Sequence, residues 1–570
     1  MVAVLAFIRG GMTQLPYNKR KVSNYSSSIN REVTNNDMTE VLEWFAMKKK
    51  ENPGFYHSLD LDENNKVRSV FWADARAILY YDICGDCVSF DTTFLTNKYN
   101  MPFAPFVGIS PHGKTYLFAC AFIVNESTES FEWCFREFKK AMGGKSPISI
   151  ITDQDKAMGV AIPEIFKDAV HKCCLFHVKK KIDDKGGPVF QANEGLYEEM
   201  QDIIDKSLIV HEFESLWQAM INEHNVGHIK IFQDLWKSIK KWVPVYFKNN
   251  FFPFIQTTAR SEGTNALFKK GVGPQFSMTS FLREYQRIMD NIHATEDELD
   301  HNVVNKRVPE KKYLTRYYIE RQAHELYNIS IFWKFQNILN DVTRLQIREE
   351  EKGKMYWVFQ ATNYPIKEHR KRDYLVQVNE ETQDYSCICC RFNKDGLLCS
   401  HILKVMLQLQ VEKIPEKYII DRWRKREKKQ FNHFIPPPNE DSTVLRFNIL
   451  SRMLGHTASN GSKNNRRYKF LIQEIPRLDA EMEKMDKETE EKSAMGQNSS
   501  TRTVVNLDPT TESGSNIQLL DPDVVDTKGT NNEGNASSKR ARKTTKQSVA
   551  EQNMVNQSVS SSATPHTDGQ

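Results

Sequence analysis

The 570 residues of the chain allow two to four domains, and a formal net charge of +5 over that length is too small to identify a nucleic-acid-binding protein by itself. Ten cysteines are too few for a secreted disulfide framework, and several stand at metal-ligand spacing, which suits a reducing compartment. No apolar run reaches roughly 18 residues, so the sequence predicts no membrane span and no membrane partner.

Helical and strand-like patterns begin after a mixed, polar segment. Residues 1–40 are predicted to be a linker or the remnant of a longer N-terminal region. A helical pattern spans residues 38–50, and alternating apolar residues at 55–61 indicate a strand. Further strands are predicted at 87–94, 105–109 and 116–124.

Helices and strands then alternate. A helix with aromatic residues on one face follows the third of these strands, with Ser127 or Thr128 as its candidate N-cap. A fourth strand at 148–152, a helix through 161–166 and a fifth strand at 169–176 come next. Three strands, a helix, a strand, a helix and another strand indicate a mixed α/β sheet.

Helical patterns dominate the region beyond this sheet. Residues 195–250 and 280–345 carry apolar residues at helical spacing. A small cysteine-containing module is predicted at 355–412, and residues 413–475 are predicted to form a charged, helical extension.

The region from 476 to 570 has the composition of a disordered tail. No Phe, Tyr or Trp follows Phe470, and Ser, Thr, Asn, Asp and Gly dominate. Such a segment cannot bury enough apolar area to offset its loss of conformational entropy. The tail contains a basic cluster that consists of Lys539, Arg540, Arg542 and Lys543. This cluster is predicted to be a nuclear localisation signal, and a solvated charge run is the alternative.

Three cysteines and a histidine form the most informative cluster in the sequence: Cys387, Cys389, Cys399 and His401. Cys₃His is an accepted tetrahedral zinc set, and a set without an open position is structural rather than catalytic. A strand-like run before the cluster and an amphipathic helix after it can bring the four side chains together. The alternative is that these cysteines and Cys390 are ordinary buried thiols. The C-x-C-x₉-C-x-H spacing resembles the SWIM zinc finger.

Acidic residues stand within or directly after two of the predicted strands. Asp91 lies on the polar face of the strand at 87–94, and a carboxylate in a largely buried strand is costly unless it is paired or binds a cation. Asp153 ends the strand at 148–152, where ligand-binding residues collect in an α/β sheet. Helix capping is the alternative for Asp153, and it is the simpler explanation for Asp155.

Seven sequence runs around these acidic residues resemble the Mutator-like (MULE) transposase domain, and especially its domesticated plant form, the far-red-impaired-response-related family. The runs are SFDTTF at 89–94, NKYNMPFAPFVG at 97–108, SFEW at 130–133, ITDQD at 151–155, CLFH at 174–177, WVPVY at 242–246 and TTARSEGTN at 257–265. With the zinc cluster, the resemblance covers about residues 40–412 in the order that the family has.

The resemblance implies an RNase H-like transposase core at about 85–270, within a transposase-like domain at 41–345 that carries a helical insertion at about 180–250. In this core Asp91, Asp153 and Glu262 would converge as a DDE triad. Active members use such carboxylates to hold two divalent cations for an in-line displacement, so Mg²⁺ is expected only if the triad is active.

Two further cysteine motifs have less certain roles. Cys174 and His177 match the C-x-x-H of the family and should stand at the end of the fifth strand, where a packed core pair is the alternative to a functional role. Cys84 and Cys87 form a lone C-x-x-C that fits a turn better than a zinc or redox site.

Members of this plant family usually begin with a zinc finger that binds DNA through two cysteines and two histidines. The first cysteine here is Cys84, and only His57 precedes it among the histidines, so residues 1–83 cannot form that finger. We therefore expect this member to have lost the finger or to begin at a misplaced start, with residues 1–40 as its remnant.

The resemblance implies a zinc-containing nuclear transcription regulator, of the activator type, that acts in light-controlled development and does not cut DNA. DNA and other members of the family, as homo- or heterodimers, are the expected partners. The alternatives are an active DDE transposase and a zinc-dependent protein-interaction module that does not bind DNA.

Overall fold

The computed structural model describes residues 37–305, 313–360, 372–425, 464–494 and 520–524, apart from Leu95, Gln256 and Arg316, together with residues 454, 457 and 461. The predicted N-terminal remnant up to residue 36, the basic cluster at 539–543 and most of the predicted disordered tail lie outside the described residues. Within the described part of the chain, no helix is both long enough and apolar enough to cross a membrane.

Seven strands form a mixed sheet in the order β1-β2-β5-β4-β3-β6-β7. Their bounds are β1 (Tyr56–Leu61), β2 (Val67–Ala73), β3 (Cys87–Phe90), β4 (Phe103–Ile109), β5 (Thr115–Phe122), β6 (Ser149–Thr152) and β7 (Val170–Cys173). The strands from β1 to β3 in this order pair antiparallel, whereas β3 pairs parallel with β6 and β6 parallel with β7. The mixed α/β sheet expected from the sequence is confirmed.

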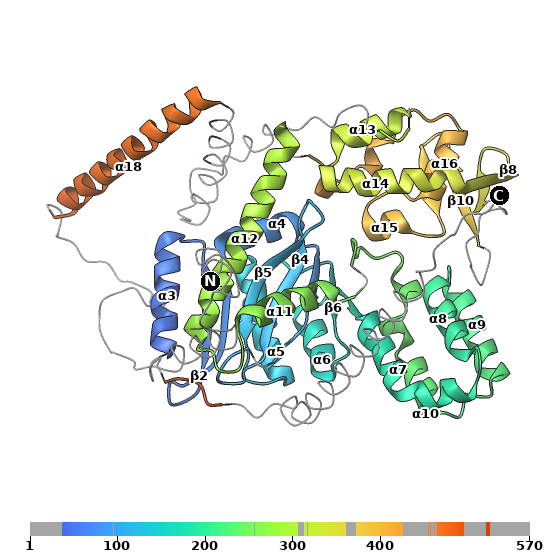
Figure 1. The fold of residues 1–570 in the computed structure, drawn as a ribbon, viewed down its shortest axis with the longest axis horizontal. Coiled ribbons are helices and arrows are strands. Elements are labelled where there is room, and N and C mark those ends of the chain that lie inside the picture. The colour runs from blue at the N-terminus through green and yellow to red at the C-terminus, as the bar shows by residue number, and fades with distance from the viewer. Residues whose placement is uncertain are drawn as a thin grey trace, which may run out of the picture.

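Helices cover both faces of this sheet (Figure 1). Phe106 in β4 stacks on Phe138 with ring centroids 4.1 Å apart, whereas Phe103, three residues earlier and on the opposite face, contacts Phe268 and Phe281. The covering helices are α3 (Asp37–Glu51), α4 (Ala75–Cys84), α5 (Thr128–Ala141), α6 (Lys156–Ile165), α11 (Ala259–Gly271) and α12 (Met278–Asn305). Ser127 is the N-cap of α5, because its hydroxyl accepts a hydrogen bond from the Ser130 backbone N–H.

A helical unit with its own hydrophobic core interrupts the chain between β7 and α11. Its elements are α7 (Leu175–Ala192), α8 (Leu196–Lys206), α9 (Val210–Glu223), α10 (Lys230–Ser238), η2 (Ile239–Lys241) and η3 (Pro244–Phe247). Trp217 and Trp242 are buried at its centre. This unit occupies the region, about 180–250, in which the resemblance implies a helical insertion.

A second module follows α12. It contains a four-stranded antiparallel sheet in the order β11-β10-β9-β8, with helices packed against it. Its elements are α13 (Tyr318–Leu326), α14 (Ile329–Asp341), η5 (Val342–Arg344), β8 (Leu345–Glu351), β9 (Met355–Gln360), β10 (Asp373–Asn379), β11 (Asp384–Cys387), α15 (Arg391–Asp395), α16 (Ser400–Gln408), η6 (Glu416–Tyr418) and η7 (Asp421–Trp423). This module thus includes α13, α14 and β8, which precede the zinc module expected at 355–412.

Three sequence expectations differ from the structure. The strand predicted at 87–94 ends at Phe90, so Asp91 follows the strand instead of lying inside it. Strand β2 and helix α4 were not predicted from the sequence. A helix, α18 (Asn465–Ala494), continues into the segment expected to be disordered from 476 onward. Its Glu and Lys residues have good helix propensity, which favours a helix without requiring a buried core.

Buried polar contacts join the second module to the seven-stranded sheet. Arg422 forms an ion pair with Asp86, which lies between α4 and β3, and its Nη2 donates a hydrogen bond of 2.9 Å to the carbonyl oxygen of Ile109 in β4. Only 5% of the Arg422 side chain is exposed. Burial raises the pKa of Asp86 to about 6, although the guanidinium opposes the shift. The interface therefore depends on this charge pair being complete.

Breaking this pair should destabilise the protein. We expect Arg422→Met to lower the free energy of unfolding by about 3 kcal/mol at pH 8, because it leaves the buried Asp86 carboxylate without its counter-ion. The loss should shrink at pH 5, where Asp86 becomes protonated. Urea unfolding measures both values, and the double variant with Asp86→Asn should recover most of the loss. Equal loss in the single and double variants would contradict this account.

Candidate functional site

Two of the three expected acidic residues stand at one edge of the seven-stranded sheet. Asp91 directly follows β3 and Asp153 directly follows β6, and these two strands are parallel neighbours. The adjacent carboxylate of Asp155 accepts a hydrogen bond of 3.0 Å from the Met158 backbone N–H and caps α6. Asp153 is therefore not the cap of this helix, and no described donor reaches its buried Oδ1 atom.

Helix α11 places the third acidic residue, Glu262, beside this edge. A buried hydrogen bond of 2.7 Å between the hydroxyls of Ser89 and Ser261 joins the helix to β3. The side-chain amide of Asn265 contacts Asp91 Oδ2 at 3.5 Å. The three carboxylates are close enough for Asp153 and Glu262 to influence the pKa of Asp91.

The C-x-x-H residues lie next to Glu262. Cys174 is the N-cap residue of α7 and His177 stands in its first turn. The Thr258 backbone N–H donates to Cys174 Sγ at 3.2 Å, and the Thr258 hydroxyl lies 3.1 Å from Glu262 Oε1 and 3.4 Å from His177 Nδ1. His177 Nε2 is 3.5 Å from Glu262 Oε1. These residues form a polar cluster and do more than pack together in a core.

Burial and mutual repulsion shift the pKa values at this edge. Burial, followed by the charge of Asp153, raises the pKa of Asp91 to about 7. Burial also raises the pKa of Asp153, with a contribution from Asp155. Burial raises the pKa of the Cys174 thiol as well, but hydrogen bonds from His177 and Thr258 outweigh it and leave that pKa below its ordinary value.

Two groups of metal-ligating side chains bring their ligand atoms within 4.8 Å of one another among the described residues. One consists of Cys174, His177 and Glu262, and the other is the cysteine cluster predicted from the sequence. The set of Asp91, Asp153 and Glu262 does not reach that proximity among the described residues. The acidic residues are thus neighbours at one edge, but Glu262 groups more closely with the thiol and the imidazole.

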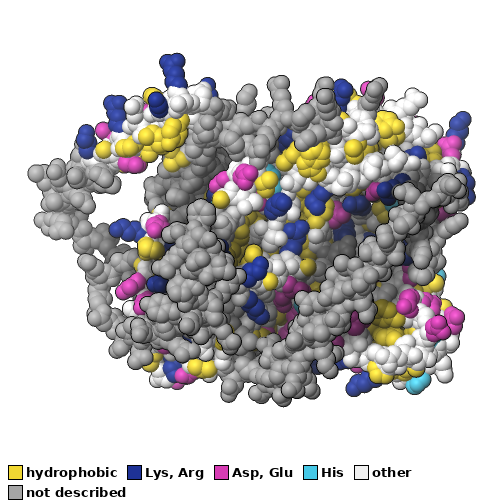
Figure 2. All heavy atoms as spheres, viewed as in Figure 1, with side chains coloured by type: hydrophobic (Ala, Val, Ile, Leu, Met, Phe, Trp, Pro, Cys, Tyr) yellow, Lys and Arg dark blue, Asp and Glu magenta, His cyan; other side chains and the backbone are white. Residues whose placement is uncertain are grey.

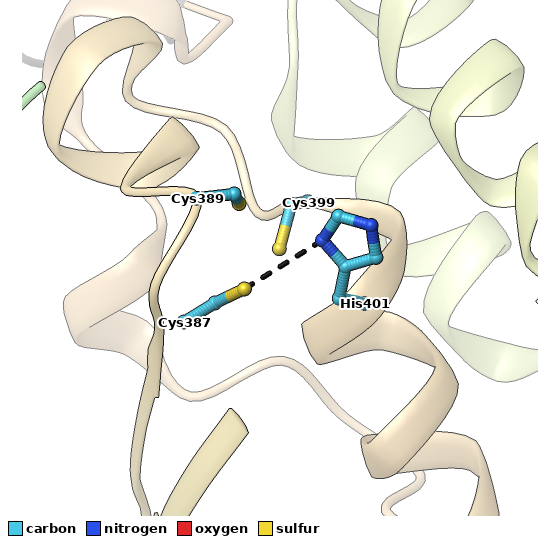
Figure 3. A group of neighbouring side chains, drawn as sticks. All are labelled: Cys387, Cys389, Cys399 and His401. Atoms are coloured by element: carbon cyan, nitrogen blue, oxygen red, sulfur yellow. Dashed lines mark hydrogen bonds between the residues drawn. The ribbon is translucent and has the colours of Figure 1, made fainter. Parts of the chain in front are cut away.

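The second group contains the four predicted zinc ligands, whose side chains point toward a common centre (Figure 3). Cys387 ends β11, Cys389 lies in the following turn, and Cys399 and His401 lie at the start of α16. Cys387 Sγ is 3.6 Å from His401 Nδ1. This spacing suits two ligands of one tetrahedral ion, since zinc bonds of about 2.1–2.3 Å separate ligand atoms by roughly 3.4–3.7 Å.

Local structure explains why Cys390 is not part of this group. Cys390 has a left-handed backbone, with φ of 52°, and its thiol lies 3.5 Å from the Ile388 carbonyl oxygen. His401 is held by stacking on Tyr374 of β10, with ring centroids 3.7 Å apart. Hydrogen bonds from Cys387 and Cys399 lower the pKa of Cys389, whereas burial raises that of Cys399. Three close thiols cannot all ionise without a cation, and a zinc ion would supply that charge.

Three residues at these sites were not identified from the sequence. Thr258 contacts every member of the Cys174 group, Asn265 contacts Asp91, and Tyr374 supports His401. Thr258, Glu262 and Asn265 are spaced at i, i+4 and i+7, which puts them on one helix face. That spacing from Glu262 could have revealed Thr258 and Asn265. The stacking of Tyr374, in contrast, depends on how β10 meets α16.

Comparison with known proteins identifies two domains. Residues 87–181 match the MULE transposase domain and residues 374–410 match the SWIM zinc finger. The chain is 29% identical over 457 residues to Protein FAR1-RELATED SEQUENCE 5 of Arabidopsis thaliana, which covers 79% of this chain and 57% of that protein. It is 29% identical over 439 residues to Protein FAR-RED IMPAIRED RESPONSE 1 of the same plant, covering 77% and 52%.

A third relative, Protein FAR1-RELATED SEQUENCE 2 of Arabidopsis thaliana, is 30% identical over 416 residues, covering 73% of this chain and 51% of that protein. The chain thus spans about half the length of these curated relatives. The resemblance to the far-red-impaired-response-related proteins, with MULE and SWIM domains, is confirmed.

The raised pKa of Asp91 predicts a pH-dependent cost. A carboxyl group whose pKa rises from 3.8 to about 7 on folding binds more protons in the folded state, so stability falls as pH increases through that interval. Relative to Asp91→Asn, we expect the wild-type protein to lose about 3 kcal/mol between pH 4 and pH 7.5 in magnesium-free buffer. Urea unfolding across this range measures the difference. The exposed Asp168→Asn variant is the control, and parallel profiles for wild type and Asp91→Asn would refute the prediction.

Zinc removal should affect the second module selectively. We expect Cys389→Ser and Cys399→Ser to lose one zinc equivalent and the hydrogen-exchange protection of β10, β11 and α16, because the tetrahedral ligand set is broken. The adjacent Cys390→Ser variant should keep both the zinc equivalent and the exchange protection. Exchange mass spectrometry, with β3 and β6 as internal references, checks the outcome. Equal zinc loss in Cys390→Ser would show that the ligand set is wrong.

Proposed function

We propose that this relative of the FAR1-related proteins, with its MULE domain and SWIM zinc finger, is a nuclear transcription regulator that binds DNA without cutting it. The observation that carries the proposal is the position of Glu262, which lies beside Asp91 and Asp153 but groups with Cys174 and His177. The sheet supports an RNase H-like core, because β6 and β7 add in parallel to an antiparallel set of strands and the pairing of β3 with β6 places two acidic residues at one edge.

The SWIM cluster has the donor set of a structural zinc site. Its three thiols and one imidazole converge from β11 and the start of α16, and they leave no ligand position open. The residues that would hold Zn²⁺ are Cys387, Cys389, Cys399 and His401. Zinc there would fix the geometry of a binding module and would supply no reactive centre.

A basic surface between the core and the second module is suited to DNA. It comprises Lys114 in the turn between β4 and β5, Arg260 of α11, Lys334 of α14 and Arg391 of α15. Burial lowers the pKa of Lys334, the positive charges of Arg260, Lys114 and Arg391 add to that shift, and Asp395, which pairs with Arg391, opposes it, so the four cations lie close together around one carboxylate. Lys and Arg side chains gather near the centre of the face in Figure 2. Phosphate groups would relieve this repulsion between cations.

A hollow of 610 Å³ beside this surface is lined by residues of both the core and the loop before α11, among them Phe254, Thr257 and Arg260. Lys334 Nζ lies 4.6 Å from the centroid of the Phe254 ring. Cationic and aromatic side chains side by side are a combination that nucleic-acid-binding surfaces use.

Charge reversal tests the DNA surface. We expect Lys114→Glu and Lys334→Glu to weaken binding to duplex DNA and to reduce the slope of log K against log[salt] by about 1 for each lost phosphate contact. Fluorescence anisotropy over a salt series measures both quantities. Lys237→Glu, an exposed change on α10, is the matched control and should bind as the wild type does.

A strand-transfer assay with Mg²⁺ separates this function from its alternatives. The regulator binds DNA, does not cleave it, and keeps its binding in Asp91→Ala. Magnesium-dependent strand transfer that disappears in Asp91→Ala would instead establish a transposase. A protein-interaction module would be established if the protein did not bind DNA and if its binding to a partner protein disappeared in Cys399→Ser.

The regulatory role also includes nuclear entry, light-controlled development and pairing with other members of the family. These parts of the proposal derive from the relatives and from the basic cluster at 539–543. Replacing Lys539 and Arg540 with alanine in a fluorescent fusion should remove the protein from plant nuclei. Unchanged nuclear accumulation would show that this cluster is not the import signal.

A further inference from the structure

We propose that Cys174, His177 and Glu262 form a second metal site that binds a zinc-type ion, separate from the SWIM cluster. The three side chains come from two helices that are distant in the sequence, since Cys174 and His177 begin α7 and Glu262 lies in the first turn of α11. Their ligand atoms lie within 4.8 Å of one another. This inference goes beyond the proposed regulatory function and does not depend on it.

The spacing of the ligand atoms fits one tetrahedral ion. His177 Nε2 and Glu262 Oε1 are 3.5 Å apart. Two ligands bonded to zinc at about 2.1 Å along tetrahedral directions are separated by roughly 3.4 Å. The SWIM cluster shows nearly the same separation, 3.6 Å, between Cys387 Sγ and His401 Nδ1. In the Cys174 group, the imidazole and the carboxylate therefore have the spacing of two ligands of one ion, with the thiol within 4.8 Å of both.

The donor types select the ion. One thiolate, one imidazole and one carboxylate form a mixed sulfur, nitrogen and oxygen set, which favours zinc or a similar transition metal over magnesium. Three protein ligands leave a fourth position for water or another ligand, unlike the closed SWIM set. An ion held there would engage Glu262 and withdraw it from any magnesium pair with Asp91 and Asp153.

Thr258 has the position of a supporting residue for this site. It is the N-cap residue of α11, and its backbone N–H and hydroxyl both lie 3.2 Å from Cys174 Sγ. Its side chain is fully buried. Hydrogen bonds of this kind stabilise a thiolate and fix its direction, as partners of metal ligands commonly do. A hydrogen-bonded polar cluster without metal is the competing explanation for the same contacts.

Zinc content of the full chain distinguishes the two explanations. The wild-type protein should carry two zinc equivalents by plasma mass spectrometry, and Cys174→Ser and His177→Ala should each carry one. Cys173→Ser is the matched control, because this neighbouring buried thiol ends β7 and is outside the group, and it should retain two. One equivalent in the wild type, unchanged in Cys174→Ser, would overturn the proposal.

A second measurement covers variants that fail to fold. In a protein with Cys387→Ser and Cys399→Ser, one metal equivalent should remain, and cobalt bound there should show a charge-transfer band from a single thiolate. Thr258→Val keeps the shape and the backbone N–H but removes the hydroxyl, and it should weaken this site alone by about 10–100-fold. The metal-free cluster would be supported if the double variant held no metal. It would also be supported if Thr258→Val left the metal affinity unchanged and cobalt gave no thiolate band.

Discussion

Parallel pairing of β3 with β6 is the constraint on which the candidate site depends. Because Ser89 aligns with Ile151, both strands end at the same edge of the sheet, and Asp91 and Asp153 follow them there. Helix α11 packs against β3 and β4, and its Ser261 bonds to Ser89 of β3. The pairing by itself holds the carboxylates of Asp91 and Asp153 at one edge, whether or not they bind a metal. The presence of these acidic residues therefore does not by itself indicate DNA cleavage.

The two cysteine-containing groups share a structural solution. Cys174 is the N-cap residue of α7 and Cys399 is the N-cap residue of α16, and a histidine lies in the first turn of each helix. The positive end of a helix dipole favours a thiolate, and the first helical turn directs a nearby imidazole toward the same point. In the SWIM cluster the end of β11 and the turn after it supply the other two ligands, whereas α11 supplies Glu262 to the Cys174 group. The same local geometry therefore yields a closed set in one module and an open one in the other.

The modules are coupled by buried contacts and not only by linkers. Arg422 spans from η7 to Asp86 and the carbonyl of Ile109, and Asn328 donates to the Pro111 carbonyl at 3.1 Å. The module that holds the SWIM ligands and the sheet that carries the acidic edge are thus parts of one connected structure. The basic surface lies across this junction, so DNA bound there would contact both modules.

Local patterns in the sequence indicated the candidate SWIM ligands, the mixed α/β sheet, the helical periodicity of residues 195–250 and the strand that leads to Asp153. These features depend on periodicity, spacing and turn residues within short segments, together with a family resemblance for Glu262. Tertiary structure decided the rest. The strand before Asp91 ends early, and Glu262 lies with Cys174, His177 and Thr258, because α7 and α11 meet across more than 80 residues of sequence. Such contacts arise from packing between distant elements, which no local pattern specifies.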